Sequence, residues 1–307
     1  MDVERILADI DGRLRRIEET LSRLTAAQGQ LGRAMNATLF SQSVYLGDHR
    51  ALTFLQNGQK IFVDTRSIDV GTHLLLDGWW EPDYMAAFGR LLKPGQCVLD
   101  IGANHGIYAL VAAQRVGPRG KVVAFEPNAQ LCDLLRASVS VNGLENIVEV
   151  VQCAVSNADG EAVLAFDEHW AARGQVRSGV DAPSTTCGTS ARSERVRRVA
   201  IDSFFANADR PVDLVKMDVE GSEGLVLDGM KHLVERSPHL RIMMEFCPSM
   251  LSTHPRDAGF VIEFLESRKF MAWAIESDGT VKPVPWSGMS GEPDVVRNII
   301  ASREAIA

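Results

Sequence analysis

Long apolar runs are missing from this sequence of 307 residues: no stretch of about 18 consecutive apolar side chains is present, so we expect no transmembrane segment. The first residues, MDVERILADIDGRLRR, lack the uncharged core of a signal peptide. The five cysteines are odd in number and without zinc-site spacing, which favours free thiols in a reducing cytoplasm. A net charge of −8 is unlike a general nucleic-acid binder. These absences indicate a cytoplasmic protein with no nucleic-acid partner.

The first 38 residues carry a heptad pattern of apolar side chains with charged residues between them. Such a pattern is typical of a coiled coil, so we expect residues 1–38 to form an oligomerisation helix. Leu at a and Ile at d favour trimers or tetramers, and the polar Gln28 can fix the register. The alternative is an amphipathic helix packed on its own domain. The a positions are Leu7, Leu14, Leu21, Gln28 and Met35, and the d positions are Val3, Ile10, Ile17, Leu24 and Leu31.

Residues 39–95 lack heptads and are expected to form a small β-hairpin and a helical lead-in. The stretch ALTFLQNGQKIFVDT alternates apolar and polar residues around Asn57-Gly58, which predicts a hairpin with a type I′ turn. The next stretch, GWWEPDYMAAFGRLLKPG, predicts a helix that begins near Pro82 and ends before Lys93.

From Gln96 onward, apolar strands alternate with helical segments, so residues 96–307 are expected to form an α/β domain. The alternation predicts a parallel sheet with helices on both faces, and ligands of such sheets bind beyond the carboxyl ends of the strands. The expected strands are Cys97–Ile101, Val122–Phe125, Ile147–Gln152, Val212–Met217, Leu240–Phe246 and Met271–Ile275, and the expected helices are 106–115, 128–141, 222–235 and 257–268.

Residues 168–198 interrupt this alternation because they are rich in Gly, Ser, Thr and Arg. We expect a long loop here, and such a loop inside a compact domain is usually functional or disordered. Its six arginines could form a lid that meets an anionic substrate, such as a nucleotide sugar or a carboxylate. A solvated, mobile loop is the alternative.

The stretch VLDIGANHG, where the first strand of the domain meets its helix, predicts a ligand site. Gly102 and Gly106 let the backbone approach a ligand, but their spacing is Gly-x-x-x-Gly rather than the Gly-x-Gly-x-x-Gly of a dinucleotide site. Asp100 would repel a pyrophosphate and suits a cationic ligand. The next strand ends in VVAFEPN, where Glu126 can accept both hydroxyls of a ribose. A ribose with a positively charged amino-acid portion and no pyrophosphate describes S-adenosylmethionine.

Four motifs together resemble those of the FkbM-type S-adenosylmethionine-dependent methyltransferases: VLDIGANHGIYALVAA, VVAFEPN, VVQCAVSNADG and VDLVKMDVEGSEGLVLDGM. The stretches GWWEPDYMAAFGRLLKPG and AIDSFF also match the usual surroundings of that family, and the resemblance covers about residues 60–300. It implies a class I, Rossmann-like methyltransferase fold, with a seven-stranded sheet whose last strand is antiparallel. It also implies methyl transfer, most often to an oxygen.

The resemblance further implies which residues hold the cofactor. Asp100 and Gly102 would hold the methionine portion, and Glu126 would bind the ribose hydroxyls. Glu81 and Tyr84 belong to a segment that packs over the cofactor in similar enzymes. His105 stands where the family is variable, as a pocket-lining residue or a catalytic base. The expected cofactor set is Glu81, Asp100, Gly102, Ala103, Asn104, Gly106, Glu126, Pro127, Ala154, Val155 and Asp218, with Ala154 and Val155 beside the adenine.

The segment KMDVEGSE and the neighbouring strand end IMMEFCP hold the remaining candidates for catalysis. Methyl transfer from a sulfonium is a direct displacement, so the enzyme mainly aligns the acceptor, and a base assists a hydroxyl acceptor. We expect Asp218 or Glu245 to be this base, with Lys216 holding a carboxylate or stabilising the acceptor oxygen. In an alternative, Asp218, Glu220 and Glu245 bind a Mg²⁺ ion that grips the acceptor.

The sequence therefore predicts an S-adenosylmethionine-dependent methyltransferase that forms homo-oligomers through residues 3–35. Its expected acceptor is a hydroxyl on a sugar, a glycan or a secondary metabolite. One alternative is a nicotinamide-dependent oxidoreductase, but Asp100 and the missing middle glycine argue against it. The other is a non-catalytic coiled-coil scaffold with a degenerate α/β domain. The presence of Asp100, Gly102, Glu126 and Asp218 argues against this second alternative.

Overall fold

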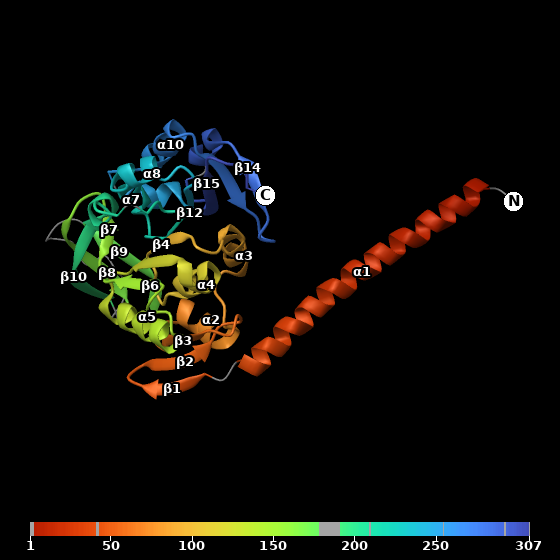
Figure 1. Cartoon of the computed structure of the whole chain (residues 1–307), viewed down its shortest axis with the longest axis horizontal. Coiled ribbons are helices and arrows are strands. Elements are labelled where there is room, and N and C mark those ends of the chain that lie inside the picture. The colour runs from red at the N-terminus through yellow and green to blue at the C-terminus, as the bar shows by residue number, and fades with distance from the viewer. Residues whose placement is uncertain are drawn as a thin grey trace.

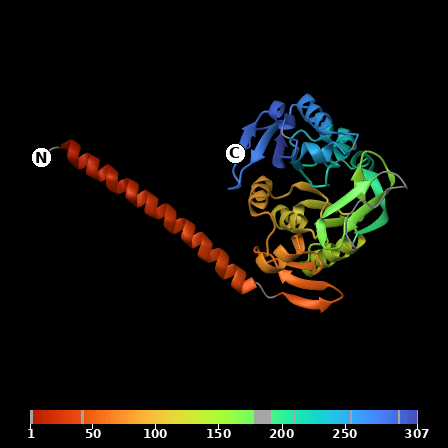
Figure 2. The same ribbon diagram turned by 180° about the vertical axis from the view of Figure 1, so that it is seen from behind.

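The N-terminal helix α1 (Val3–Phe40) extends away from the rest of the molecule (Figures 1 and 2). The computed structural model describes residues 3–40, 43–177, 191–208, 210–253, 255–291 and 293–306. The described apolar side chains of α1 between Leu7 and Leu31 are exposed: Leu14 is 52% exposed, Leu24 61% and Leu31 62%. The predicted helix is confirmed, and over these residues its apolar stripe does not pack on the α/β domain of its own chain.

A small antiparallel sheet of β1 (Val44–Gly47), β2 (Arg50–Phe54) and β3 (Lys60–Asp64) follows α1. The predicted hairpin is present as the β2–β3 pair, but the type I′ assignment of its turn was wrong. Type I′ needs positive φ at both central residues. Of Asn57 and Gly58, only Gly58 has a positive φ (84°), whereas Asp48 and His49, between β1 and β2, have φ of 49° and 57°. Helices α2 (Val70–Asp77) and α3 (Pro82–Leu91) complete this part of the chain.

The main sheet of the described chain has eight strands in the order β14-β13-β15-β12-β11-β4-β5-β6 (Figure 1). β4, β5, β6, β11 and β12 are parallel, and β15 is antiparallel to both of its neighbours, β12 and β13. The antiparallel last strand is as expected, while the sheet has one strand more than the seven expected because β14 adds to its edge. The strands are β4 (Cys97–Ile101), β5 (Lys121–Phe125), β6 (Val148–Val151), β11 (Leu214–Met217), β12 (Arg241–Phe246), β13 (Met271–Ile275), β14 (Val281–Val284) and β15 (Arg297–Ser302).

Helices cover both faces of the main sheet, and alternate strand residues belong to two separate cores. Leu99 and Val215 pack in the core that α7, α8 and α10 cover, whereas Val98 and Leu214 pack in the core that α3, α4 and α5 cover. The remaining helices of the described chain are α4 (Ile107–Val116), η1 (Gly117–Arg119), α5 (Ala129–Val141), α6 (Ile201–Phe204), α7 (Glu223–Asp228), α8 (Lys231–Arg236), α9 (Pro248–Leu251), α10 (Ala258–Ser267) and η2 (Trp286–Gly291).

The helix predicted over 222–235 is divided into α7 and α8. Gly229 lies at the break, and a Cβ on it would stand 2.1 Å from the carbonyl oxygen of Ser156. The break therefore occurs where this turn touches β7 (Ala154–Ser156). No helix in the described ranges combines the length and the apolar character needed to cross a membrane.

The long loop predicted over 168–198 was wrong for most of its length. β9 (Trp170–Arg177) and β10 (Ala191–Ala200) join β7 and β8 (Gly160–Asp167) in a second sheet, in the order β7-β10-β8-β9. β10 pairs with β8 over eight residues although it carries four of the six arginines: Arg192, Arg195 and Arg197 are exposed, while Val196 and Val199 are buried in two different cores. Residues 178–190 of the predicted loop lie outside the described residues.

Candidate active site

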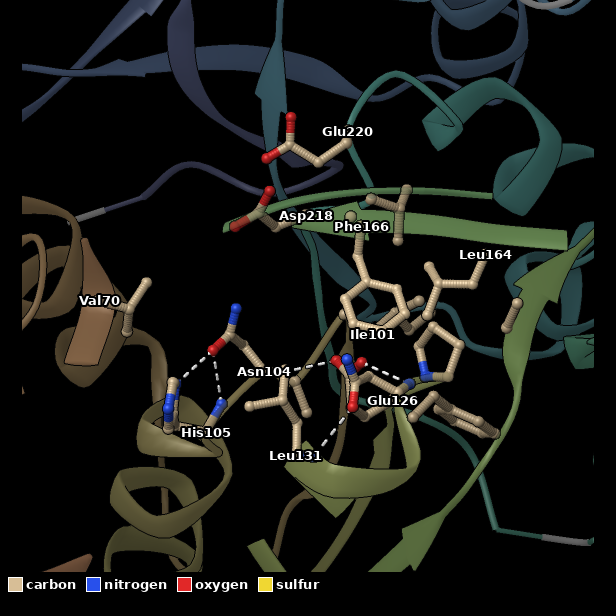
Figure 3. Close-up of a pocket in the computed structure, with 18 of the residues that line it drawn as sticks. Val70, Ile101, Asn104, His105, Glu126, Leu131, Leu164, Phe166, Asp218 and Glu220 are labelled. Carbon is tan, nitrogen blue, oxygen red and sulfur yellow. Dashed lines mark hydrogen bonds between the residues drawn. The ribbon is translucent and has the colours of Figure 1, made fainter. Parts of the chain in front are cut away.

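One pocket lies beyond the carboxyl ends of β4, β5, β11 and β12, with the second sheet as a further wall (Figure 3). The strand ends bring together most of the site residues that were predicted from the sequence. The predicted residues that line the pocket are Glu81, Gly102, Ala103, Asn104, His105, Glu126, Pro127, Ala154, Val155, Lys216, Asp218, Glu220 and Glu245. Asp100 and Gly106 lie behind the lining.

Gly102 and Gly106 shape the turn between β4 and α4, with φ of 78° and 88°. A Cβ on Gly102 would stand 2.0 Å from the carbonyl oxygen of Asp218, and one on Gly106 would stand 2.0 Å from Leu135 Cδ1. The atoms that forbid side chains here belong to the protein itself. The sequence argument had assigned the close approach to a ligand, whereas these glycines let the turn pack against β11 and α5.

Glu126, at the end of β5, is held by two backbone amides. The N–H groups of Asn104 and Asn128 each donate to its carboxylate at 2.8 Å, as the dashed lines in Figure 3 show. Burial raises its pKa to about 7, although these two hydrogen bonds act in the opposite direction. The carboxylate is therefore fixed in direction, with its remaining acceptor capacity available to a ligand hydroxyl.

Lys216 and Asp100 form a buried pair directly behind the pocket. Asp100 is fully buried, and Lys216 Nζ lies 3.9 Å from Oδ1. Burial raises the Asp100 pKa to about 6, while Lys216 and the backbone of Ala109 oppose this. Burial disfavours the charged form of Lys216, but Asp218, Asp100 and Glu81 outweigh it and raise the lysine pKa. Lys216 thus stays charged and also contacts Asp218 at 3.4 Å.

His105 connects the cofactor turn to the N-terminal sheet. Its Nε2 accepts from the backbone N–H of Asp64 (3.2 Å), and its Nδ1 lies 2.6 Å from Asn104 Oδ1. Burial lowers its pKa to about 4, so the ring is neutral and its contacts assign the proton to Nδ1. Both nitrogens are engaged within the protein, a geometry that suits a positioning residue better than the predicted catalytic base.

Acidic side chains gather at the other end of the pocket. Glu245 at the end of β12 is half-buried, and burial, Asp218 and Glu81 together raise its pKa to about 7. Glu81 accepts a hydrogen bond from Tyr108 Oη at 2.9 Å. Glu81 and Glu220 hold left-handed backbone conformations, with φ of 46° and 52°, and such strain in non-glycine residues concentrates at functional sites.

The alternative Mg²⁺ site is not supported by this arrangement. Within the described ranges, no three or more His, Cys, Asp or Glu side chains are grouped so that they could hold a metal ion, and this includes Asp218, Glu220 and Glu245. Figure 3 shows Asp218 and Glu220 near each other on the loop after β11, with their carboxylates in the pocket. Glu223 is buried, accepts from the backbone N–H of Val219, and does not line the pocket.

The second sheet supplies an apolar wall that the sequence analysis missed. Leu164 and Phe166 of β8 face the pocket near Glu126, as Figure 3 shows, beside Ala154 and Val155 of β7. The alternation VLAFD in residues 163–167 was the available signal, and it was overlooked because no strand was expected between 152 and 212.

A polar cluster at the rim was also missed. Arg66 pairs with Asp64 (2.8 Å) and with Glu168 (2.6 Å), and it donates to Gln130 (2.5 Å). Arg192 of β10 contacts the same Glu168 oxygen at 3.2 Å. These residues come from four separate segments, so spacing along the sequence could not have grouped them. Together they tie the N-terminal sheet to the second sheet across the pocket.

A family model described as the methyltransferase FkbM domain matches residues 100–271, more than half of the chain. The chain belongs to the FkbM methyltransferase family. Among curated relatives of this FkbM protein, AMB antimetabolite synthetase AmbE of Pseudomonas aeruginosa is 28% identical over 171 residues, which cover 46% of this chain and 8% of that protein. Methyltransferase sdnD of Sordaria araneosa is 24% identical over 155 residues, which cover 43% and 60%. The chain thus spans less than two thirds of either relative.

Solved structures similar to this FkbM chain include methyltransferase FkbM from Methylobacillus flagellatus, with 13% identity, a TM-score of 0.42, and coverage of 76% of this chain and 60% of that one. Another is an O-methyltransferase from Bacillus cereus in complex with SAH, with 16% identity, a TM-score of 0.40, and coverage of 72% and 79%. The fold of this chain is that of class I methyltransferases, and family and fold together support S-adenosylmethionine dependence.

The pocket of this FkbM protein fits S-adenosylmethionine in its donor set. Glu126 is oriented toward the cavity by two amides, as hydroxyls of a ribose would require. Asp100 lies buried behind the lining with Lys216 Nζ 3.9 Å from Oδ1, so the structure gives its carboxylate no direct contact with the cavity. The apolar wall of Leu164 and Phe166 suits a flat base.

Proposed function

We propose that this protein transfers a methyl group from S-adenosylmethionine to a hydroxyl of a sugar, a glycan or a secondary metabolite. The observation that carries the proposal is Glu245, a half-buried pocket carboxylate with a pKa raised to about 7. It lies at the end of β12, and β11 and β4 separate this strand from β5, whose end carries Glu126. A base is most effective when its pKa lies near the working pH. Glu245 has this property on the sheet edge where ligands of α/β folds bind.

The cofactor roles are part of the proposal. Asp100 and the Gly102 turn would hold the methionine portion, and Glu126 with Pro127 would hold the ribose. Ala154 and Val155 would contact the adenine. Leu164 and Phe166, which line the same wall of the pocket, would cover it. When bound, S-adenosylmethionine supplies a sulfonium methyl group that is open to direct displacement.

The residues of this chain then have distinct tasks in the transfer. Glu245 would accept the proton of the acceptor hydroxyl as its oxygen attacks the methyl carbon, and Asp218 is the alternative base. Lys216, between Asp100 and Asp218, keeps both carboxylates in place. Trp80 and Phe166 line the same pocket and would exclude water from it.

To test this function, the protein is incubated with S-adenosylmethionine and each of a panel of sugars and hydroxylated metabolites, and the formation of S-adenosylhomocysteine is measured. Glu245→Gln keeps the shape of the side chain, and we expect it to lower kcat about 10²-fold or more while leaving S-adenosylhomocysteine affinity unchanged. Glu263→Gln, on the exposed face of α10, is the matched control. An unchanged kcat for Glu245→Gln would assign the base to another residue.

We also propose that 1–38 assembles catalytic domains into a parallel homo-oligomer, with 39–95 as lead-in and 96–307 as methyltransferase domain. The exposed stripe of α1 supports a second copy as its partner. In a parallel, in-register arrangement Gln28 faces the same residue of the next copy, and Arg13 at g meets Glu18 at e of its neighbour. In an antiparallel arrangement Gln28 would face an apolar layer, at a cost in stability.

We also propose a cytoplasmic location, since the described cysteines are buried free thiols.

Oxidation of Leu14→Cys tests the parallel arrangement, because position 14 then lies beside itself in the neighbouring copy. We expect an intermolecular disulfide with Leu14→Cys and none with Gly12→Cys, which lies on the outer f position. Light scattering on the full chain and on a chain that starts near Phe40 gives the number of copies. A monomeric full chain, or no crosslink with Leu14→Cys, would contradict the proposal.

A further inference from the structure

The hairpin of β8 and β9 forms one wall of the pocket and lies at the edge of the second sheet. Leu164 and Phe166 of β8 line the pocket, together with Gly174 and Val176 of β9. β8 also pairs with β10, whereas β9 is the outermost strand in the order β7-β10-β8-β9. Because an edge strand is paired on one side only, contacts outside the second sheet decide how firmly this wall is held.

A bulge in the hairpin coincides with Phe166. The register of the β8–β9 pair shifts between Ala165 and Asp167. Bulges bend a strand and re-aim a side chain, and they are frequent beside active sites. Figure 3 shows the Phe166 ring near Glu126, the expected ribose ligand. The irregular point of the hairpin is therefore the residue that faces the expected adenosine end of the pocket.

Arg66 connects the turn of this hairpin to the N-terminal sheet. Its Nη1 donates to Glu168, in the turn between β8 and β9, at 2.6 Å. Its Nε and Nη2 donate to the two carboxylate oxygens of Asp64 at 3.1 and 2.8 Å, and Nη2 also donates to Gln130 at 2.5 Å. A planar guanidinium held by such a two-point contact has a fixed direction. Asp64 thus aims the arginine at the hairpin.

Burial and neighbouring contacts strengthen this connection. The side chains of Arg66 and Glu168 are 18% and 15% exposed, so water and salt screen their charges less than those of a surface pair. Arg192, one of the arginines of the predicted lid, contacts the same Glu168 oxygen at 3.2 Å. The backbone N–H of Ile68 donates to the carbonyl oxygen of His169 at 2.9 Å. The segment after β3 therefore holds the hairpin turn at two successive residues.

We propose that Arg66 and Glu168 form a clasp that holds the β8–β9 hairpin over the adenosine end of the cofactor and slows cofactor release. Arg66 is then a positioning residue. Four of its five N–H donors already bind protein groups, so it acts through the hairpin rather than on the cofactor. The inference rests on the proposed function, because that function assigns the adenine to the wall that contains Phe166.

Surface plasmon resonance of S-adenosylhomocysteine on the immobilised full chain tests the clasp. We expect Glu168→Ala to raise the dissociation rate constant about tenfold and to change the association rate constant less than about threefold, because a charge-assisted contact of the closed wall is lost. The double variant Arg66→Ala/Glu168→Ala should dissociate within about twofold of Arg66→Ala alone, since the two residues act as a pair. Glu161→Ala is the matched control on β8, because it removes only an exposed ion pair with Arg195, and both rate constants should stay unchanged.

Hydrogen exchange of the free chain separates a clasp from a general role in stability. Glu168→Ala should speed the exchange of amides in β8 and β9 and leave that of β4 and β5 unchanged, because only the hairpin is released. A merely structural role would instead speed exchange in both sheets.

Equal dissociation from Glu168→Ala and the unchanged chain overturns the inference. Faster dissociation from Arg66→Ala but not from Glu168→Ala also overturns it, because Arg66 would then contact the cofactor directly. Faster exchange of β4 and β5 in Glu168→Ala contradicts it as well. The proposed function fails by a different result, namely an unchanged chain that does not bind S-adenosylhomocysteine, which would also remove the ligand that the clasp is proposed to retain.

Discussion

The two ends of the pocket are built by different means. At the cofactor end, Glu126 accepts two backbone N–H bonds and His105 has both ring nitrogens engaged, so the polar groups are fixed before any ligand arrives. At the other end, the proposed acceptor end, the Asp218 charge raises the pKa values of Glu81 and Glu245, and the charge of Lys216 lowers them. The first end is preorganised by hydrogen bonds, whereas the carboxylates of the second repel one another and Lys216 offsets part of this repulsion.

The largest expected effect tests the packing at the cofactor end. Gly102→Ala places a Cβ 2.0 Å from the Asp218 carbonyl oxygen at a φ of 78°, and we expect it to lower the free energy of unfolding by about 3 kcal/mol or more. Gly143→Ala is the control, since φ is 67° there but no atom lies within 4 Å, and it should cost about 1 kcal/mol. Denaturant unfolding measures both, and equal losses would show that the contact with Asp218 is unimportant.

A smaller effect is expected for His105→Leu, which removes the acceptor for the Asp64 N–H and the support of Asn104. The free energy of unfolding should fall by about 1–3 kcal/mol, and affinity for S-adenosylhomocysteine should fall about tenfold with little change in kcat. His105→Gln, whose amide oxygen can replace Nε2, should recover part of the affinity.

The outcome separates two roles for His105. If His105 were the catalytic base, kcat would instead fall about 10²–10⁴-fold while the cofactor affinity stayed the same.

The smallest effect concerns the acceptor end and pH. The pKa of Glu245 is raised from 4.5 to about 7, so between these values the folded chain keeps a proton that the unfolded chain has released. The free energy of unfolding therefore falls as pH rises from about 4.5 to 7, and this contribution is fully present only below 4.5. Glu245→Gln should flatten part of that fall, whereas Glu263→Gln should not. Identical slopes would contradict the repulsion at the acceptor end.

Sequence patterns were sufficient where one segment carries its own signal. β4 and β13 have the predicted bounds, since a continuous apolar run with turn residues on both sides marks a buried strand. They were insufficient for β10, where the buried Val196 and Val199 stand among four arginines, and for the Asn57-Gly58 turn.

The candidate site shows the same division. The residues at the strand ends, such as Glu126 and Asp218, could be found because parallel strands end at one edge. The Arg66 cluster could not be found, because Asp64, Gln130 and Glu168 meet only where the N-terminal sheet, α5 and the loop after β8 come together in the fold.

The most direct test of the central claim is calorimetric titration of the purified chain with S-adenosylmethionine, S-adenosylhomocysteine and NAD, repeated on Glu126→Ala. We predict that the two methionine-derived ligands bind, that NAD does not, and that Glu126→Ala loses about 10²-fold or more in affinity because a buried carboxylate no longer meets the ribose. Heat with NAD alone would contradict the assignment of the pocket. Equal binding by Glu126→Ala would show that the preorganised end of the pocket holds something other than the ribose.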